Sequence, residues 1–270
     1  MTTFKARVRC LLPLLLGACG LFAIIHAWSG KSQPAAQAAS KEESATIPLP
    51  PAARLVIHVG EYKGKSADLL KPAAAAWEQA APTHIVLNRT PRIYQSEPVR
   101  TLPPPALEVR AFRSDGKLVL RMRWNDATRD APEAPPSKTG SGGDSKKIYK
   151  RPTGETDSFA DAMAVMVPER WTGKEFPSLV MGDKHTAARI YYWNASRGAE
   201  ELHATGRATQ QSTGKTFAHD AQYKAGKWSV TAEIGEPPQG CPIAFAVWDG
   251  HERDRDGLKC VSIWYVLKWQ

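Results

Sequence analysis

The sequence predicts an all-β protein, an antiparallel β-sandwich with few short helices. Short apolar runs rich in β-branched and aromatic residues recur along the chain, separated by turn residues, and the 270 residues include 21 prolines and 9 tryptophans. Many short strands at this kind of spacing are typical of sandwiches. No internal repeat of the length found in solenoids and propellers is present. We therefore expect one folded domain, at residues 53–270.

The N-terminal segment, residues 1–30, is predicted to be a signal peptide or a membrane anchor. Residues 10–28 are almost wholly apolar and follow three basic residues, a pattern typical of export signals and of single spans. Three alternatives remain open: an uncleaved anchor, cleavage near residues 36–38 (AQA), or lipidation at Cys19. Each places the rest of the chain in the periplasm or on the outer face of the inner membrane.

Residues 31–52 are rich in Ala, Ser, Gln and Pro, which predicts a flexible linker. The first strand is expected at residues 53–59. Residues 68–80 are rich in alanine but contain a proline, which predicts one or two helical turns. A second short strand is expected at residues 83–87.

The clearest local prediction is a β-hairpin. Residues 107–113 and 118–124 alternate apolar and polar side chains around the turn SDGK at residues 114–117. Residues 129–156 then bring many Pro, Gly, Lys and Arg residues with hardly any aromatic ones. Such a segment cannot bury a face, so we expect it to be a surface insertion.

The remaining apolar runs complete about nine predicted strands: residues 161–167, 187–193, 223–232, 243–248 and 261–267. The last two flank a polar turn at residues 249–257, which predicts a C-terminal hairpin. Lys259 stands at the head of the second strand of this hairpin. Cys241 and Cys260 lie at its outer ends, and a disulfide between them would suit an oxidising compartment.

Composition excludes several classes of function. From residue 31 onward the chain carries 33 basic and 27 acidic residues, a balance of +6, without a cluster of Arg and Lys interleaved with aromatics. We therefore predict no binding to nucleic acid. The sequence contains no HExxH, GxSxG, P-loop, GxGxxG, CxxC or CxxCH motif. No catalytic group emerges, and no covalent haem attachment is expected.

Four stretches read together carry a resemblance. They are LRMRWNDAT (120–128), DSFADAMAVMVP (157–168), FPSLVMGD followed by ARIYYWNA (176–195), and PIAFAVWDG…RDGLKCVSIWYVL (242–267). In order and spacing this set resembles the haem b-binding gamma subunits of the ethylbenzene dehydrogenase and dimethyl sulfide dehydrogenase type. That family also includes gamma subunits of selenate and chlorate reductases and of some nitrite oxidoreductases. The resemblance covers roughly residues 53–269.

The resemblance implies a β-sandwich that holds one non-covalent haem b between its sheets or at their edge, with a methionine and a lysine as ligands. The matching residues are Met181 and Lys259. A thioether suits haem iron, and Gly182 would let the backbone approach a flat macrocycle. A lysine ligates only as a neutral amine, which requires burial. Trp193 and Trp248 would be aromatic neighbours of the cofactor.

Other assignments stay open at this point. Met181 could fill a gap in the core, and Lys259 could extend its charge into solvent. Other side chains could also ligate iron: the thioethers of Met122, Met163 and Met166 and the imidazoles of His185, His203 and His251.

The implied function is electron transfer without substrate chemistry in this chain. It would relay electrons between the iron–sulfur (beta) subunit of a complex whose alpha subunit contains molybdenum and a soluble cytochrome c or membrane acceptor. Two alternatives of other classes are a haem-free sandwich that binds carbohydrate or another ligand through exposed tryptophans, and a structural anchor subunit of a membrane complex.

Overall fold

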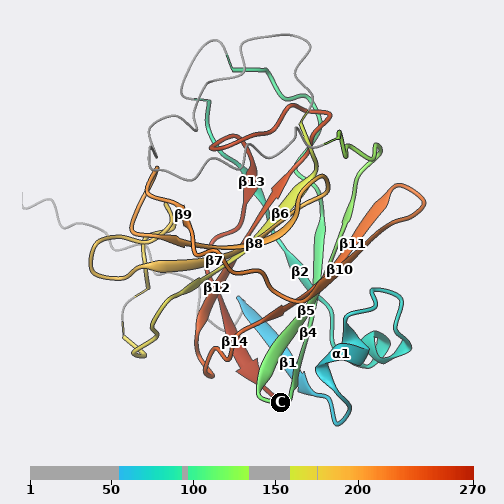
Figure 1. Ribbon diagram of the computed structural model, residues 1–270, viewed down its shortest axis with the longest axis vertical. Helices are drawn as coiled ribbons and strands as arrows, with labels where there is room; N and C mark the ends of the chain where they lie inside the picture. The colour runs from blue at the N-terminus through green and yellow to red at the C-terminus, as the bar shows by residue number, and fades with distance from the viewer. Residues whose placement is uncertain (1–54, 93–96, 134–158, 175) are drawn as a thin grey trace, which may run out of the picture. The chain divides into compact units, whose positions relative to one another are not determined.

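The computed structural model describes four stretches of the chain, residues 55–92, 97–133, 159–174 and 176–270 (Figure 1). The predicted signal or anchor, the predicted linker and most of the predicted insertion lie outside these described residues. Among the helices of the described stretches, none is both long and apolar enough to cross a membrane.

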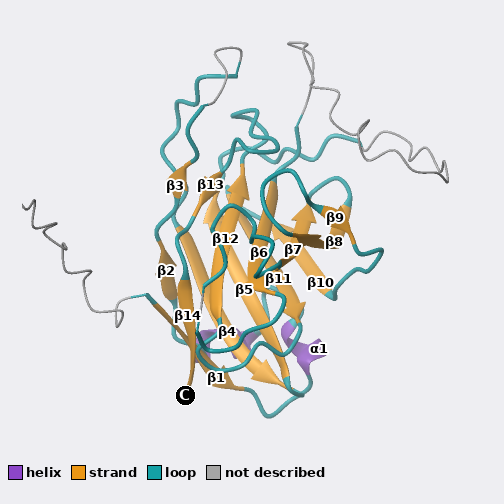
Figure 2. Ribbon diagram, turned by 90° about the vertical axis from the view of Figure 1, so that its left-hand side faces the viewer, coloured by secondary structure: helices purple, strands orange, loops and turns teal. Residues whose placement is uncertain are grey.

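The described residues form strands with two short helical segments, as the all-β prediction required (Figure 2). Of the two helical segments, the 3-10 helix η2 (Ala75–Gln79) lies within the predicted stretch at residues 68–80, and α1 (Ser66–Leu69) overlaps its start. The strands are β1 (Val56–Glu61), β2 (Thr83–Ile85), β3 (Asn88–Arg89), β4 (Leu107–Ser114), β5 (Lys117–Asn125), β6 (Ala162–Pro168), β7 (Ala188–Asn194), β8 (Gly198–Ala204), β9 (Gln211–Ser212), β10 (His219–Tyr223), β11 (Lys227–Ile234), β12 (Pro242–Trp248), β13 (Cys260–Val261) and β14 (Tyr265–Trp269).

The main path of the sheet runs β10-β11-β5-β4-β1-β14-β12-β6-β7-β8-β9. Strand β12 joins its two halves. Its first residues, Pro242 and Ile243, pair with β14, whereas the rest of β12 pairs with β6 on one side and partly with β13 on the other. Because one strand serves both halves, the sheet curls over and its two halves face each other across one apolar core.

The antiparallel arrangement predicted from sequence is wrong for one strand. Strand β1 is parallel to both of its neighbours, β14 and β4, so the sheet is mixed. The chain between β1 and β4 contains α1, η2 and β2, which is enough for the crossover that parallel neighbours need. Alternation of apolar residues is the same in both directions and does not encode strand direction.

The core between the halves is built from one side of each strand. Trp124 of β5, Trp193 of β7 and Trp228 of β11 pack there, with the Trp193 and Trp228 ring centroids 5.0 Å apart. The outer face of β4 and β5 is covered differently, because α1 and η2 place Leu69 and Trp77 against it. The outer face of β6, β7 and β12 carries a cavity instead.

The C-terminal hairpin differs from the prediction in its second strand. The run at residues 261–267 is broken between β13 and β14, so β12 pairs with β13 near its end and with β14 near its start. Cys260 therefore lies opposite Val247, six residues along β12 from Cys241. Six strand residues span about 20 Å, whereas a disulfide needs Cα atoms within about 7 Å. The predicted disulfide is wrong, and both cysteines are free and buried.

Candidate cofactor site

The floor of the cavity is the outer face of β12, β6 and β7. Side chains alternate between the two faces of a strand, and the even-numbered residues of these three strands face the cavity while the odd-numbered ones face the core. The register sets Ala246 beside Ala164, and Ala244 beside Met166. With methyl groups at three adjacent positions, the floor has room for a broad, flat group.

The cavity has a volume of about 570 Å³, within the range of about 300–1,000 Å³ that is typical of small-molecule sites. The loop at residues 176–183 forms one wall, the turn at residues 254–259 another, and β8 a third. Apolar side chains make most of the floor, and polar ones gather at the rim. This arrangement suits a flat, mostly apolar ligand with a polar edge.

Met181 lines the cavity from the loop at residues 176–183. Its φ is +71°, a conformation that side chains other than glycine rarely adopt. The surrounding contacts hold the loop in place: Gly206 N–H donates to the Met181 carbonyl (3.0 Å), and Trp264 Nε1 donates to the Pro177 carbonyl (3.0 Å). Strain maintained by neighbouring contacts is found at functional sites.

The two residues after Met181 shape this loop. Gly182 has a φ of +78°, and a Cβ there would lie 2.8 Å from both Ala188 N and the Thr186 carbonyl. The glycine is therefore needed where the loop meets β7. It was expected beside the cofactor, but it is not among the residues that line the cavity. Asp183 accepts hydrogen bonds from the N–H groups of Thr186 (2.9 Å) and His185 (2.8 Å), which lower the pKa of its carboxyl.

Lys259 lines the same cavity from the opposite wall. Its Nζ lies 4.8 Å from the ring centroid of Trp248, which also lines the cavity. Burial lowers the pKa of Lys259 to about 8, and the nearby Asp256 only partly opposes this shift. Among the described residues, no carboxylate pairs with this amine and no acceptor takes a hydrogen bond from it. The amine is still mostly protonated near neutral pH, but its neutral form is much easier to reach than that of an ordinary lysine.

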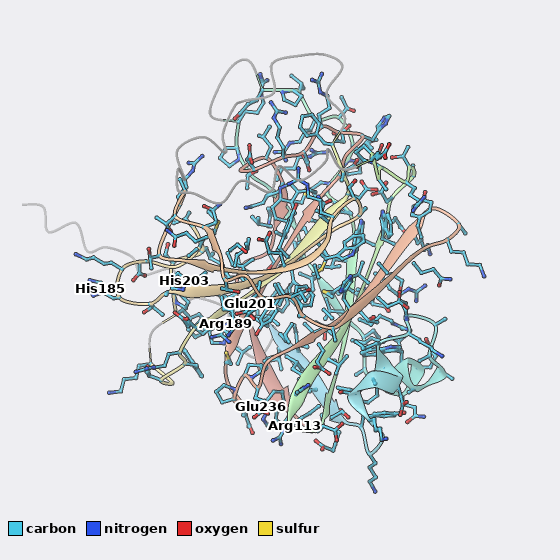
Figure 3. All side chains as sticks on the ribbon, in the orientation of Figure 1. Arg113, His185, Arg189, Glu201, His203 and Glu236 are labelled. Carbon is cyan, nitrogen blue, oxygen red and sulfur yellow. The ribbon has the colours of Figure 1, made fainter. Side chains whose placement is uncertain are left out.

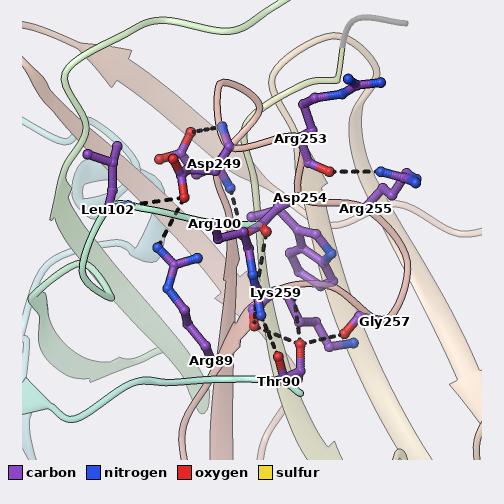
Figure 4. A network of polar contacts seen from close by, with 12 residues as sticks. Arg89, Thr90, Arg100, Leu102, Asp249, Arg253, Asp254, Arg255, Gly257 and Lys259 are labelled. Atoms are coloured by element: carbon purple, nitrogen blue, oxygen red, sulfur yellow. Dashed lines mark hydrogen bonds and ion pairs between the residues drawn. The ribbon is translucent and has the colours of Figure 1, made fainter. Parts of the chain in front are cut away.

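The backbone of Lys259, in contrast, is fully engaged (Figure 4). Its N–H donates to Thr90 Oγ1 (3.0 Å), and its carbonyl accepts from the Thr90 N–H (2.9 Å) and from Arg100 Nη1 (3.1 Å). Strand β3, which carries Arg89 opposite Cys260, brings Thr90 to this position. These contacts hold Lys259 in place, the role that was expected of the disulfide.

The rim of the cavity has unsatisfied polar groups. Ser196 Oγ and Gln210 Oε1 are buried without a hydrogen-bond partner, and both residues line the cavity. Arg197 and Arg255 also line it, and neither forms an ion pair with an acid in the described part of the chain. Buried polar atoms normally have partners, so this rim is suited to the polar edge of a ligand. Glu200 and Asp256 share the rim, which gives it both signs of charge.

The other predicted ligands separate clearly. Met166 lines the cavity floor and stays a competing thioether, whereas Met122 and Met163 lie in the core on the other face. His203 Nδ1 lies 3.2 Å from Glu169 Oε2, near Arg189 and Glu201 (Figure 3). Neither His203 nor the exposed His185 and His251 lines the cavity.

Trp193 requires a correction. It was predicted to contact the cofactor, but it faces the core, where it packs against Trp124 and Trp228. The reason is the alternation along β7: Ile190, Tyr192 and Asn194 take the cavity side, which leaves Trp193 on the other side.

A cluster of acidic side chains was not foreseen from sequence. Carboxylate oxygens of Asp126, Asp130, Asp161 and Asp249 lie within 4.8 Å of one another. Asp161 accepts hydrogen bonds from Gly250 N–H (2.9 Å), Asp130 N–H (2.7 Å) and Trp228 Nε1 (2.9 Å). Burial raises the pKa of Asp126 to about 7 and that of Asp161 to about 6. This cluster ties three loops together beside the core.

The cavity fits a haem group in size, floor and donor types. A thioether and an amine of lowered pKa reach it from opposite walls, and soft sulfur and neutral nitrogen are donors that haem iron accepts. The alanine floor leaves space for a macrocycle, and the unpaired rim cations could hold carboxylates.

Comparison with known proteins points the same way. The model of the family described as "Ethylbenzene dehydrogenase" matches residues 74–225, more than half of the chain. The chlorate reductase subunit gamma of Ideonella dechloratans is 29% identical over 232 residues, which cover 81% of this chain and 87% of that protein.

Two further relatives have lower identity. A protein of Haloferax mediterranei whose name describes a respiratory nitrate reductase heme subunit is 26% identical over 210 residues, covering 72% of this chain and 66% of that protein. The dimethylsulfide dehydrogenase subunit gamma of Rhodovulum sulfidophilum is 23% identical over 218 residues, covering 73% of each chain.

Proposed function

Because the chain belongs to the ethylbenzene dehydrogenase family, we propose that it is an electron-transfer subunit that binds one haem b non-covalently in the cavity between Met181 and Lys259. The names of its relatives, gamma subunits and a heme subunit of oxidoreductases, support this proposal. The partners would be the iron–sulfur and molybdenum subunits of such a complex.

The observation that carries the proposal is that Met181 and Lys259 line one cavity. They are 78 positions apart in the sequence and come from different walls, a loop held by Trp264 and a turn held by Thr90. Most methionines and lysines would simply fill a core or face solvent. Neither role explains a strained methionine and an unpaired amine that share one apolar cavity.

Each residue would have a distinct task. Bound haem supplies one-electron chemistry at its iron. The thioether of Met181 would donate to the iron, and a thioether donor raises a haem potential. Burial beside Trp248 lowers the pKa of Lys259, so that its amine would lose its proton at a smaller cost and could serve as the second donor. The alanine floor would exclude water from the macrocycle face, which also acts on the potential.

The rim would hold the carboxylate edge of the cofactor. Arg197 and Arg255 lack acidic partners within the described stretches, and the hydroxyl of the adjacent Ser196 is unsatisfied. Guanidinium groups bind carboxylates with charge-assisted hydrogen bonds. Recognition at this edge would orient the cofactor in the cavity.

The sequence pattern supports a proposal for location, and the family resemblance supports one for the electron acceptor. The apolar residues 10–28 favour export, so the domain would work in the periplasm or at the outer face of the inner membrane. It would pass electrons between the iron–sulfur subunit and a soluble cytochrome c or a membrane acceptor, with no substrate chemistry of its own.

An absorption spectrum of the purified full chain tests the proposal. We expect a Soret band that shifts on reduction, and Met181→Ala and Lys259→Ala should each change the spectrum or lose haem. Lys268→Ala, at an exposed lysine on β14, is the matched control. Met166→Ala distinguishes between the two thioethers in the cavity. If the absorption bands of the methionine ligand are lost in Met166→Ala and kept in Met181→Ala, Met166 is the ligand instead. Protein that takes up no haem would refute the proposal.

A further inference from the structure

The position of Lys259 depends on two residues far away in the sequence. Strand β13 has only two residues, and the chain before it is a turn, so pairing with β12 alone leaves the backbone of Lys259 outside the ladder. The contacts that fix it come from Thr90 and Arg100. No motif marks either residue.

Thr90 clasps the backbone of Lys259 on both sides. Its N–H donates to the Lys259 carbonyl (2.9 Å), and its Oγ1 accepts from the Lys259 N–H (3.0 Å). The same hydroxyl donates to the Gly257 carbonyl (2.7 Å). One side chain therefore fixes the end of the turn and the start of the strand together.

Arg100 closes the network from behind (Figure 4). Its Nη1 donates to the Lys259 carbonyl (3.1 Å) and lies 3.2 Å from Asp254 Oδ1, while its Nη2 donates to the Thr90 carbonyl. The side chains of Arg100 and Asp254 are 4% and 2% exposed. A buried ion pair contributes little net stability. The pair of Arg100 and Asp254 is therefore better explained by its effect on position, because it holds the guanidinium against the Lys259 carbonyl.

We infer that Thr90 and Arg100 are positioning residues that hold the Lys259 amine in the cavity, over Trp248, ready to act as a ligand. This inference rests on the proposed function, because it gives the amine a task. The amine has no hydrogen-bond partner among the described residues, so the fixed backbone and the Trp248 ring determine where it lies. Fixed donors bind without the loss of freedom that a mobile side chain incurs.

The neighbouring pair Arg89 and Glu252 provides a matched control. It also joins the β3 segment to the turn at residues 249–257, at 3.2 Å. Arg89 donates to Glu252, and Glu252 also accepts from the N–H groups of Thr101 and Leu102. None of these hydrogen bonds involves Lys259. Arg89→Gln thus removes a comparable ion pair from the same segment without releasing the backbone of Lys259.

The experiment compares Thr90→Val, Arg100→Gln, Thr90→Ser and Arg89→Gln in the full chain, loaded with haem. Thr90→Val and Arg100→Gln should alter the ligand-sensitive bands, shift the midpoint potential and speed haem transfer to an excess of globin by about 10–100-fold, as loss of supporting contacts does elsewhere. Thr90→Ser keeps the hydroxyl and should restore the wild-type spectrum. Arg89→Gln should leave the spectrum and the potential unchanged.

A second measurement does not need haem. In the haem-free chain, acetylation of Lys259 followed by mass spectrometry reports whether the amine is held in the cavity. Thr90→Val and Arg100→Gln should raise its labelling rate about tenfold, and Arg89→Gln should not, because opening a buried site exposes the group to reagent. Equal rates in all variants, or equal spectral changes in Arg89→Gln and Arg100→Gln, would overturn the inference. Failure of the wild type to bind haem would refute the proposed function alone.

Discussion

The Nζ of Lys259 lies 4.8 Å from the centroid of the Trp248 ring, and Trp248 Nε1 donates to the carbonyl of Asp256 (3.3 Å). The face of the Trp248 indole thus contacts the Lys259 amine, and its Nε1 edge contacts the turn that precedes Lys259. An aromatic face attracts a cation, but here its larger effect is to keep water away from the amine. Trp248 therefore belongs to the site without being a ligand.

Replacing Trp248 should change the protonation of Lys259. Trp248→Ala opens the cavity to water, so the pKa of Lys259 should rise from about 8 toward its ordinary value of 10.5. The pH dependence of Lys259 acetylation in the haem-free chain measures this, with Lys268 as an internal reference. Removal of a buried tryptophan also costs about 3–5 kcal/mol of stability, which is checked by urea unfolding. A pKa that stays at about 8 would show that Trp248 does not exclude water there.

If the rim arginines bind the haem carboxylates, replacing them should weaken the binding of haem but not that of its dimethyl ester. Arg197→Gln and Arg255→Gln should each weaken binding of haem by about 0.5–2 kcal/mol, the usual range for a charged hydrogen bond at a partly exposed site. Neither should weaken binding of the ester, which has no carboxylates. Absorbance titrations provide both affinities.

Arg113→Gln, at an exposed end of β4, is the control for the loss of a positive charge. Equal weakening for haem and ester would mean that the rim arginines act through folding instead.

The aspartate cluster predicts a pH dependence of stability. Burial, together with the charges of Asp161 and Asp249, raises the pKa of Asp126 to about 7. Between pH 4 and 7 the native state therefore retains a proton that the unfolded chain releases, so this group's contribution to stability falls as the pH rises through that window.

Asp126→Asn removes the charge and keeps the oxygen that accepts from Thr128 N–H (3.1 Å). Its unfolding free energy should match wild type near pH 4 and exceed it by about 1–3 kcal/mol at pH 8. Urea unfolding at both pH values measures the difference. A gain that is larger at pH 4 would contradict the sign.

Much of the fold follows from patterns that act locally. The hairpin of β4 and β5 and the buried strands β6, β7 and β12 coincide with apolar runs read from sequence. In contrast, β8 was missed because its sequence, GAEELHA, is polar, and β8 is a strand by virtue of its pairing with β7. Whether a polar segment becomes a strand depends on its neighbours more than on its own residues.

The errors at the site have a common cause. Alternation along β7 separates Tyr192 from Trp193, but it does not say which face meets the core, so Trp193 was placed on the wrong side. The predicted disulfide assumed an unbroken strand after Lys259. Strand β12 instead changes partners along its length, a tertiary feature that local propensity cannot reveal. Met181, in contrast, was picked out from a local sequence motif, which does not depend on how the strands pair.

Gly182 permits a sharp test of the loop that carries Met181. An alanine there must adopt a φ of +78°, and its Cβ would lie 2.8 Å from two backbone atoms. Gly182→Ala should therefore destabilise the chain by about 2–4 kcal/mol, more than the roughly 1–2 kcal/mol of the left-handed conformation alone. It should also weaken haem binding, because the loop must shift away from β7 and carry Met181 with it.

Gly173→Ala is the matched control, since Gly173 has a φ of +80° and no described atom lies within 4 Å of the position that its methyl group would take. This variant should incur only the conformational cost and leave the haem spectrum intact. Urea unfolding and a spectral titration of both variants separate the two effects. Equal losses of stability would show that β7 and the loop yield easily at Gly182, and an unchanged spectrum in Gly182→Ala would mean that the placement of Met181 does not depend on this close approach.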